Sequence, residues 1–318
     1  MKNLLSALFI LGVLTTGFAQ EPLYKLKGHA DLITGVAFAD DSKTLASAGS
    51  WENKVFIWNA AGAAQIKTIP VTGQCMSVAY LSKSKLIATS GNDVLILDTD
   101  KGSIAKTFKG HTETAWHVAL NKSKNLIATG GWDNNCIIWD IKKGKKKKVL
   151  TGHTSYINRV SFSVDGTQLA SAAEDRTVKI WEVKTGNLVK TLTDHTAAAS
   201  EVVYSPNGKF MATGGDDNAV FIYRTDTYER VGTTPPQKDK VRALAFDPTS
   251  SMLAVGAGSD AKEVNVYSTE TWTRVIKLTG PDSFVNNLTF SPDGKYLAGA
   301  SSDKNVYIWD AAKFPKVN

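Results

Sequence analysis

The stretch VALNKSKNLIATGG, residues 118–131, returns 42 positions later as VSFSVDGTQLASAA, residues 160–173. Each copy begins with a β-branched residue, passes through a polar turn and ends in a run of small residues. Seven such copies occur, spaced by 42, 40, 42, 42, 42 and 44 residues, and their anchoring apolar positions are Val36, Val78, Val118, Val160, Val202, Leu244 and Leu288. This period indicates an array of one supersecondary unit.

Each unit is expected to form four short β-strands. The first two lie in the quoted stretch, the third ends in an aromatic residue, and the fourth is a run such as LVKTL, residues 188–192. A sheet that is apolar on both faces is stable in water only when both are covered, and radial packing against like neighbours covers them. The sequence therefore predicts an all-β fold, a seven-bladed β-propeller with four antiparallel strands per blade.

The two ends of the chain predict how this ring closes. Leu23 to Leu26 look like a fourth strand without the preceding three, and the last unit stops after its third strand at Asp310. We expect the N-terminal strand to join the last blade, because closure removes open sheet edges that invite aggregation.

Recurring signature residues give a family resemblance. Gly-His or Asp-His pairs precede the first strand at His29, His111, His153 and His195, and third strands end in pairs such as Trp139-Asp140. In spacing, signature and copy number the chain resembles the WD-repeat β-propeller family, and we expect a secreted, bacterial-type member.

This resemblance implies a hydrogen-bonded tetrad of His, Ser or Thr, Asp and Trp in a regular blade. A buried imidazole between a carboxylate and a hydroxyl has all its polar groups satisfied, and the indole shields the site and donates to it. The matching residues are His111, Thr129, Asp133 and Trp139 in the third unit, His153, Ser171, Asp175 and Trp181 in the fourth, and His195, Thr213, Asp217 and Tyr223 in the fifth.

Other units depart from the pattern. Val71 and Pro281 stand where His is expected, Leu97 replaces the Trp, and the sixth unit has an insertion around Ser259 and Asp260, so these blades are expected to be looser. In the first unit Glu52 takes the Asp place with one extra residue in the turn, which puts that tetrad in doubt.

The repeated Ser, His and Asp residues are read as structural and not as catalytic, because a catalytic triad is needed once, beside an oxyanion site. His117 lies outside the tetrads and is expected to be a packed, hydrogen-bonded residue of an innermost strand. The sequence has no H-E-x-x-H, paired-Cys, phosphate-loop or regular EF-hand pattern. We expect no enzyme, metal or cofactor; an enzyme working in the central channel is the remaining alternative.

The resemblance also implies a partner-binding face. In the family, partners touch the residues three and five places after the His and the one before the tetrad Asp, on the top of the ring. The residues we expect to bind a partner are Leu32, Trp51, Met76, Trp116, Trp132, Tyr156, Asn158, Glu174, Asp216, Lys240, Arg242 and Phe284. Thr34, Gln74, Thr114, Ala198, Ser200, Asn286 and Ser302 hold corresponding places.

Large aromatic residues with a charged rim are typical of binding hot spots, although some of these side chains could instead be tucked between blades. The leading interpretation is a scaffold that docks a protein or an extended peptide around Trp51, Trp116, Trp132 and Tyr156. The alternative is a glycan or anionic-surface binder that uses exposed Trp residues and a Lys-rich loop. A monomeric propeller is expected in either case.

The first residues, MKNLLSALFILGVLTTGFAQ, have the pattern of a secretory signal peptide, with Gly17 and Ala19 as small residues before the cleavage point. We expect a signal peptide at 1–19, a propeller at 20–318 and export to the periplasm or the extracellular space; a membrane span is the competing interpretation. After signal removal no transmembrane segment is expected. Cys75 and Cys136 lie in different units and are expected to be free, buried thiols.

The net charge of +7 is partly concentrated in Lys142, Lys143 and Lys145 to Lys148. This run is expected to be a solvated hairpin tip, and binding to an anionic polysaccharide or lipid surface is the alternative. Nucleic acid is not expected as a partner, because no aromatic residues interleave with these lysines.

Overall fold

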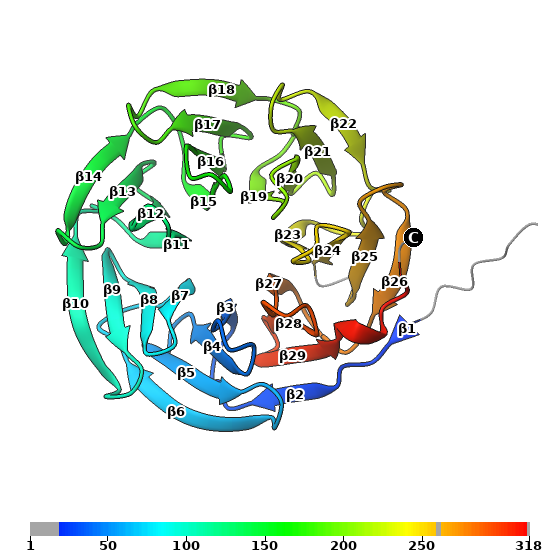
Figure 1. Ribbon diagram of the computed structural model, residues 1–318, viewed down its shortest axis with the longest axis horizontal. Coiled ribbons are helices and arrows are strands. Elements are labelled where there is room, and N and C mark those ends of the chain that lie inside the picture. The colour runs from blue at the N-terminus through cyan, green and yellow to red at the C-terminus, as the bar shows by residue number, and fades with distance from the viewer. Residues whose placement is uncertain (1–18, 259–261, 317–318) are drawn as a thin grey trace, which may run out of the picture.

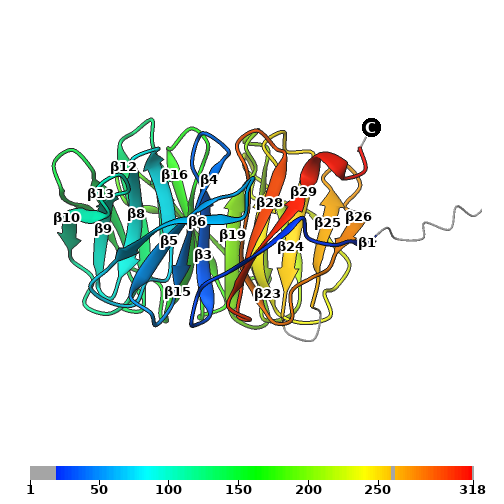
Figure 2. The same ribbon diagram turned by 90° about the horizontal axis from the view of Figure 1, so that it is seen from below.

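Seven β-sheets stand side by side around a central channel in the computed structural model, which describes residues 19–258 and 262–316 (Figure 1). Seen from the side, the blades form a squat cylinder (Figure 2). The predicted seven-bladed propeller, with four antiparallel strands in each blade, is confirmed. The expected signal peptide, up to residue 18, and the insertion at Ser259 and Asp260 lie outside the described residues.

The first four blades follow one another along the chain, each with its first strand innermost. Blade 1 comprises β3 (Ile33–Phe38), β4 (Thr44–Gly49), β5 (Lys54–Asn59) and β6 (Ala64–Pro70). Blade 2 comprises β7 (Val78–Ser82), β8 (Lys85–Ser90), β9 (Asp93–Asp98) and β10 (Ser103–Lys109). Blade 3 comprises β11 (Ala115–Asn121), β12 (Leu126–Gly131), β13 (Cys136–Asp140) and β14 (Lys145–Leu150). Blade 4 comprises β15 (Ile157–Phe162), β16 (Gln168–Ala173), β17 (Val178–Glu182) and β18 (Leu188–Leu192).

The remaining three blades complete the ring. Blade 5 comprises β19 (Ala199–Tyr204), β20 (Phe210–Gly215), β21 (Val220–Arg224) and β22 (Arg230–Thr233). Blade 6 comprises β23 (Val241–Phe246), β24 (Met252–Ala257), β25 (Val264–Ser268) and β26 (Arg274–Leu278), with β1 (Ala19–Gln20) as a fifth strand. Blade 7 comprises β27 (Val285–Phe290), β28 (Tyr296–Ser301), β29 (Asn305–Asp310) and β2 (Tyr24–Lys27), and a short 3-10 helix, Ala311–Lys313, follows β29.

Strand β2 closes the ring as predicted. It pairs antiparallel with β29, and Leu26 lies opposite Val306. The strand runs from Tyr24 to Lys27, so it begins and ends one residue later than the expected range, Leu23 to Leu26. The parallel pairing of β1 with β26, which places Gln20 opposite Leu278, is an addition that nothing in the repeat predicts. The N-terminal segment therefore contacts two neighbouring blades.

The apolar core lies between the blades. Each neighbouring pair of blades shares one buried cluster, such as the one that joins Ile87 of blade 2 to Trp139 of blade 3. A further cluster joins Ile308 of blade 7 to Val36 of blade 1, so the closing interface is packed like the others. Small residues on the second strands allow this approach: a Cβ added at Gly130 would lie 2.4 Å from Ile157 Cγ2 of the next blade.

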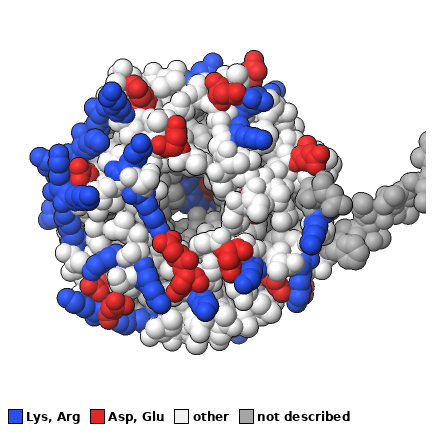
Figure 3. Space-filling view, viewed as in Figure 1, with Lys and Arg blue, Asp and Glu red and all other residues white. Residues whose placement is uncertain are grey.

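The lysine run corrects one expectation. Lys142 and Lys143 lie in the turn after β13, but Lys145 to Lys148 belong to β14, the outermost strand of blade 3. Lys and Arg side chains gather along the rim at the positions of β10 and β14 (Figure 3). The outermost strand of a blade has an unpaired edge, and lysines on such an edge hinder pairing with another chain. The run is therefore an edge strand more than a hairpin tip.

Both cysteines are free and buried, as predicted. Cys75 precedes β7, whereas Cys136 lies in β13. Burial raises the pKa of each thiol to about 12. Over the described part of the chain there is no helix with the length and apolar character to cross a membrane.

Candidate functional site at the mouth of the channel

A buried hydrogen-bonded chain fixes the loops at the top of blade 3. Trp139 Nε1 donates to Thr129 Oγ1 at 2.9 Å, and Thr129 Oγ1 lies 2.7 Å from His111 Nε2. His111 Nδ1 lies 2.9 Å from Asp133, which also accepts the Thr112 amide at 3.0 Å. Burial by itself raises the pKa of Asp133, but the hydrogen bond and charge of His111 bring this pKa below its usual value. This row of hydrogen bonds connects the loop before the first strand of the blade to the turn before its third strand.

Blade 4 repeats this arrangement with Ser171, which lies 2.7 Å from His153 Nε2 and accepts Trp181 Nε1 at 2.9 Å. His153 Nδ1 lies 2.8 Å from Asp175. The four residues expected to form the tetrad are in contact in the expected order.

Blade 5 carries a variant. His195 lies 2.9 Å from Thr213 and 3.0 Å from Asp217, but Tyr223 donates its hydroxyl hydrogen to Asp194 at 2.9 Å. Burial lowers the pKa of His195 despite the Asp217 charge, so the ring is neutral at pH 7. A neutral, immobilised imidazole suits a structural role.

Blade 1 corrects the doubt about its tetrad. His29 Nδ1 lies 2.5 Å from Glu52, His29 Nε2 lies 2.6 Å from Ser47, and Trp58 donates to Ser47 at 2.7 Å. The longer Glu side chain spans the extra residue in the turn, so this tetrad is complete.

The irregular blades use other networks. In blade 6 Gln237 donates to Tyr267 at 2.9 Å, and in blade 7 Tyr307 donates to Asp303 at 2.7 Å. The buried Val71 and Leu97 of blade 2 hold the places of two tetrad residues. That these blades are looser stays a prediction.

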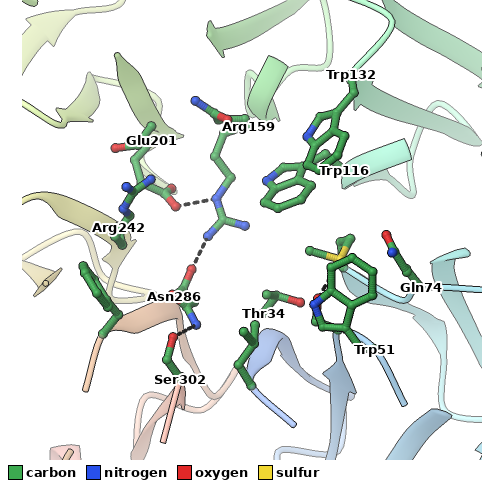
Figure 4. Close-up of a pocket in the computed structure, with 16 residues that line it drawn as sticks. Thr34, Trp51, Gln74, Trp116, Trp132, Arg159, Glu201, Arg242, Asn286 and Ser302 are labelled. Atoms are coloured by element: carbon green, nitrogen blue, oxygen red, sulfur yellow. Dashed lines mark hydrogen bonds and ion pairs between the residues drawn. The ribbon is translucent and has the colours of Figure 1, made fainter. Parts of the chain in front are cut away.

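In six of the blades a β-bulge near the start of the first strand turns one side chain toward the channel mouth. The pairing register shifts at this position in six blades, for example between Ile157 and Arg159, and a bulge re-aims the side chain of its extra residue. The residues so placed are Thr34, Trp116, Asn158, Ser200, Arg242 and Asn286, with Met76 in the same place just before β7. All seven line one cavity of about 330 Å³ (Figure 4).

One side of this cavity is an aromatic wall. Trp116 stacks on Trp132 with ring centroids 5.0 Å apart, and Trp132 stacks on Tyr156 at 5.4 Å. Trp51 stands at the rim with 61% of its surface exposed. We call Trp116, Trp132 and Tyr156 the aromatic ladder.

The opposite rim is charged. Asp216 accepts hydrogen bonds from Lys240 at 2.9 Å and from Arg242 at 3.3 Å. On the aromatic side, Asn158 donates to Glu174 at 3.0 Å, and the Glu174 amide donates to the Tyr156 carbonyl at 2.9 Å. Aromatic and charged groups thus face each other across the channel mouth.

The residues expected to bind a partner divide into two groups. Those that line the cavity are Leu32, Trp51, Met76, Trp116, Trp132, Asn158, Arg242 and Phe284. Those that lie beside it are Tyr156, Glu174, Asp216 and Lys240, and they reach it through the contacts just described. Met76 is only 5% exposed, so it is one of the side chains tucked between blades, and the Ser50 hydroxyl donates to its sulfur at 3.2 Å.

The floor of the cavity consists of two charged residues that the sequence analysis missed, Arg159 and Glu201. They form a buried ion pair through Arg159 Nε, and Arg159 Nη2 donates to the backbone carbonyl of Asn286, in blade 7, at 2.9 Å. Both also line a second cavity of about 440 Å³ lower in the channel, so they separate the two spaces. Burial raises the pKa of Glu201 to about 7, against the opposing charges of Arg159 and Arg242.

A signal for this pair exists in the repeat. Arg159 and Glu201 immediately precede the anchors Val160 and Val202, so they hold the same place in neighbouring blades and carry opposite charges. His117 holds this place in blade 3; it is half-buried, and its Nδ1 accepts the Val160 amide at 3.3 Å, in keeping with the packed role expected for it. Burial, and then the Arg159 charge, keep the pKa of His117 well below its usual value.

The described residues include no group of three or more His, Cys, Asp or Glu side chains arranged to hold a metal ion. The tetrad histidines are committed to hydrogen bonds within their blades. What the arrangement offers is a rigid, partly aromatic recess.

Comparison with known proteins agrees with this geometry. The sequence profile of the family described as WD domain, G-beta repeat matches residues 20–59, 102–140, 144–182, 186–224 and 272–310, which together exceed half of the chain.

Several curated proteins are similar over shorter segments. The chain is 29% identical over 128 residues to the ribosome biogenesis protein WDR12 homolog of Culex quinquefasciatus, covering 38% of this chain and 30% of that protein. It is 37% identical over 75 residues to the periodic tryptophan protein 2 homolog of Dictyostelium discoideum, covering 24% and 8%. It is 43% identical over 47 residues to protein HIRA of the same organism, covering 15% and 4%. The chain thus spans less than a third of each relative, and these eukaryotic proteins do not support the bacterial-type assignment.

Proposed function

The chain belongs to the WD domain, G-beta repeat family, and from that premise we propose that it is a non-catalytic scaffold that docks a protein or an extended peptide at the mouth of its channel. WD propellers generally serve as interaction platforms. The proposal further places this scaffold in the cell envelope or the extracellular space.

The observation that carries the proposal is the aromatic ladder beside a recess of about 330 Å³. Aromatic anchors around a pocket with a polar rim are typical of binding hot spots. The tetrads hold the surrounding loops in place before any partner arrives, which lowers the ordering cost of association. The large apolar side chain of Trp51 is mostly exposed at the rim of the recess, where it adds apolar surface that a partner can cover.

Export is proposed from the sequence of the first 20 residues, where Lys2 precedes an apolar run that ends in Gly17 and Ala19. N-terminal sequencing of the chain recovered from a culture tests this. A mature protein that starts at or next to Gln20 is expected, and an intact N-terminus in the cytoplasm would contradict it.

Affinity purification tests the docking site. The tagged chain is used to capture partners from an envelope or secreted fraction, beside a Trp116→Ala, Trp132→Ala variant. The matched control is Val164→Ala, which removes an exposed apolar side chain, 56% exposed, from the hairpin between β15 and β16. Loss of partners in the double variant alone is expected; unchanged capture with an intact fold would refute the site.

A second candidate function is binding to a glycan or an anionic surface. It is favoured by the exposed lysines of β14 and by Trp51. The ladder rings cover one another's faces, which leaves fewer free faces for a sugar ring. Binding to a glycan array, with a steep decrease as salt rises, would favour this candidate over protein docking.

A further inference from the structure

Among the described residues, the charged side chains that line the cavity itself carry a net positive charge. Arg159 and Arg242 line it, and Glu201 is the one carboxylate among these lining residues. Outside the cavity, at the rim, Lys240 and Asp216 offset each other at 2.9 Å, and Glu174 accepts a hydrogen bond from Asn158 at 3.0 Å. The recess therefore favours a ligand with one negative charge.

Arg159 has one nitrogen, Nη1, that is available to a ligand. Its side chain is only 9% exposed, Nε is paired with Glu201 and Nη2 with the Asn286 carbonyl. Among the described residues Nη1 has no hydrogen-bond acceptor, and it points into the middle of the cavity toward Trp116 (Figure 4). A guanidinium presents its donors as a rigid fork, so a nitrogen that faces the cavity and has no acceptor among the described residues marks a place where a ligand oxygen fits.

Arg242 supplies a second group on the same side of the cavity. Its side chain is 32% exposed, and its contact with Asp216, at 3.3 Å, is shared with Lys240. Most of its donors have no acceptor among the described residues and can bind a ligand.

We propose that the partner places a carboxylate in the channel mouth, where Arg159 Nη1 and Arg242 bind it, while apolar residues next to the carboxylate lie on the aromatic ladder. This inference rests on the proposed docking function and specifies the chemistry of the docked segment. The carboxylate is either an Asp or Glu side chain or the C-terminus of a chain.

A cationic ligand fits this site poorly, because it would approach two guanidinium groups and because the ring faces that could hold it are stacked on one another. Above about pH 7, where Glu201 is ionised and offsets one of the two guanidinium charges, a doubly charged anion also fits less well. Charge-assisted hydrogen bonds between guanidinium and carboxylate are short and directional, and they are stronger than neutral ones.

The test is a selection of binders from a displayed library of random nonapeptides, half with free C-termini and half amidated, on the full 318-residue chain. The expected binders are enriched in Asp, Glu or free C-termini and lose affinity for Trp116→Ala, Trp132→Ala. Replacing the carboxylate of a selected peptide by a carboxamide should weaken binding about tenfold or more. Separate side-chain and C-terminal amides distinguish the two sources.

A double-mutant cycle then locates the carboxylate. Arg242→Gln should remove most of the difference between the acid and amide peptides, whereas the control Arg224→Gln, an equal change in charge on an exposed residue of β21, should leave the difference intact. For the floor we use Arg159→Met together with Glu201→Gln, because removing both charges avoids leaving a buried carboxylate unpaired.

The outcomes separate the two proposals. Ladder-dependent peptides are those that lose affinity for the Trp116→Ala, Trp132→Ala variant. If these peptides show no preference for a carboxylate, or are enriched in Lys and Arg, this inference is overturned and the docking function stands. Failure to select any ladder-dependent peptide would overturn both.

Discussion

Replacing Thr129 by Val should destabilise the ring more than the same replacement at Thr213. Both side chains are fully buried at equivalent places in the third and fifth repeats, and Val keeps the shape of Thr. At Thr129 the hydroxyl serves two partners, Trp139 Nε1 at 2.9 Å and His111 Nε2 at 2.7 Å. At Thr213 it lies 2.9 Å from His195 Nε2 and also contacts the Tyr223 hydroxyl, but Tyr223 gives its own hydrogen to Asp194 at 2.9 Å and keeps that acceptor when Thr213 is replaced.

A buried polar group left without a partner costs about 1–3 kcal/mol. Thr129→Val leaves two such groups, so its free energy of unfolding should fall by roughly 2–6 kcal/mol, against about 1–3 kcal/mol for Thr213→Val. The loss of the hydroxyl and the gain of a methyl group are common to both variants and cancel in the comparison.

Equilibrium unfolding in guanidinium chloride, followed by far-UV circular dichroism and by tryptophan fluorescence, measures the difference. Coincident transitions in both signals are the condition for converting midpoints into free energies. Equal losses in the two variants, or a larger loss at Thr213, would refute the inference that the indole depends on the Thr129 hydroxyl.

Three further outcomes are expected. Leu26→Asp should open the ring, because this side chain is 1% exposed in the closing strand, and size-exclusion chromatography should show aggregation that the exposed control Lys27→Asp lacks. Burial raises the pKa of Glu201 from 4.5 to about 7, so the folded state holds a proton that the unfolded state has lost; stability should therefore fall as pH rises from about 4.5 to 7, and denaturant melts of Glu201→Gln should lack this slope. Cys75 and Cys136 should resist a thiol reagent at pH 8 in the native state and react in denaturant; rapid native labelling would contradict their burial.

The fold could be predicted because its determinants repeat. Anchors such as Val118 and Val160 recur once in every blade. The same pattern of apolar residues therefore covers both faces of each sheet when like blades pack side by side. Ring closure followed from an unpaired strand at one end of the chain and a missing one at the other.

The candidate site could be predicted in part. Positions counted from the tetrad histidines found the aromatic wall, but the ion pair of Arg159 and Glu201 was missed because no motif marks the residue before each anchor. The spacing of repeats left open whether Met76 faces solvent or is tucked between blades, and only the packing beside Ser50 shows that it is buried. The tetrad of blade 1 was in doubt because the turn has one extra residue, and the sequence pattern does not show that the longer side chain of Glu52 still reaches His29.

The hydrogen bond from Arg159 to Asn286 has a mechanical consequence. Each blade packs only against its two neighbours, so packing alone resists pushing the blades together along the ring but does little to keep the ring round. A single bond from blade 4 to blade 7 acts as a spoke, holding opposite walls at a set distance. A molecule that captured this guanidinium for itself would release the spoke and let the whole circle change its outline.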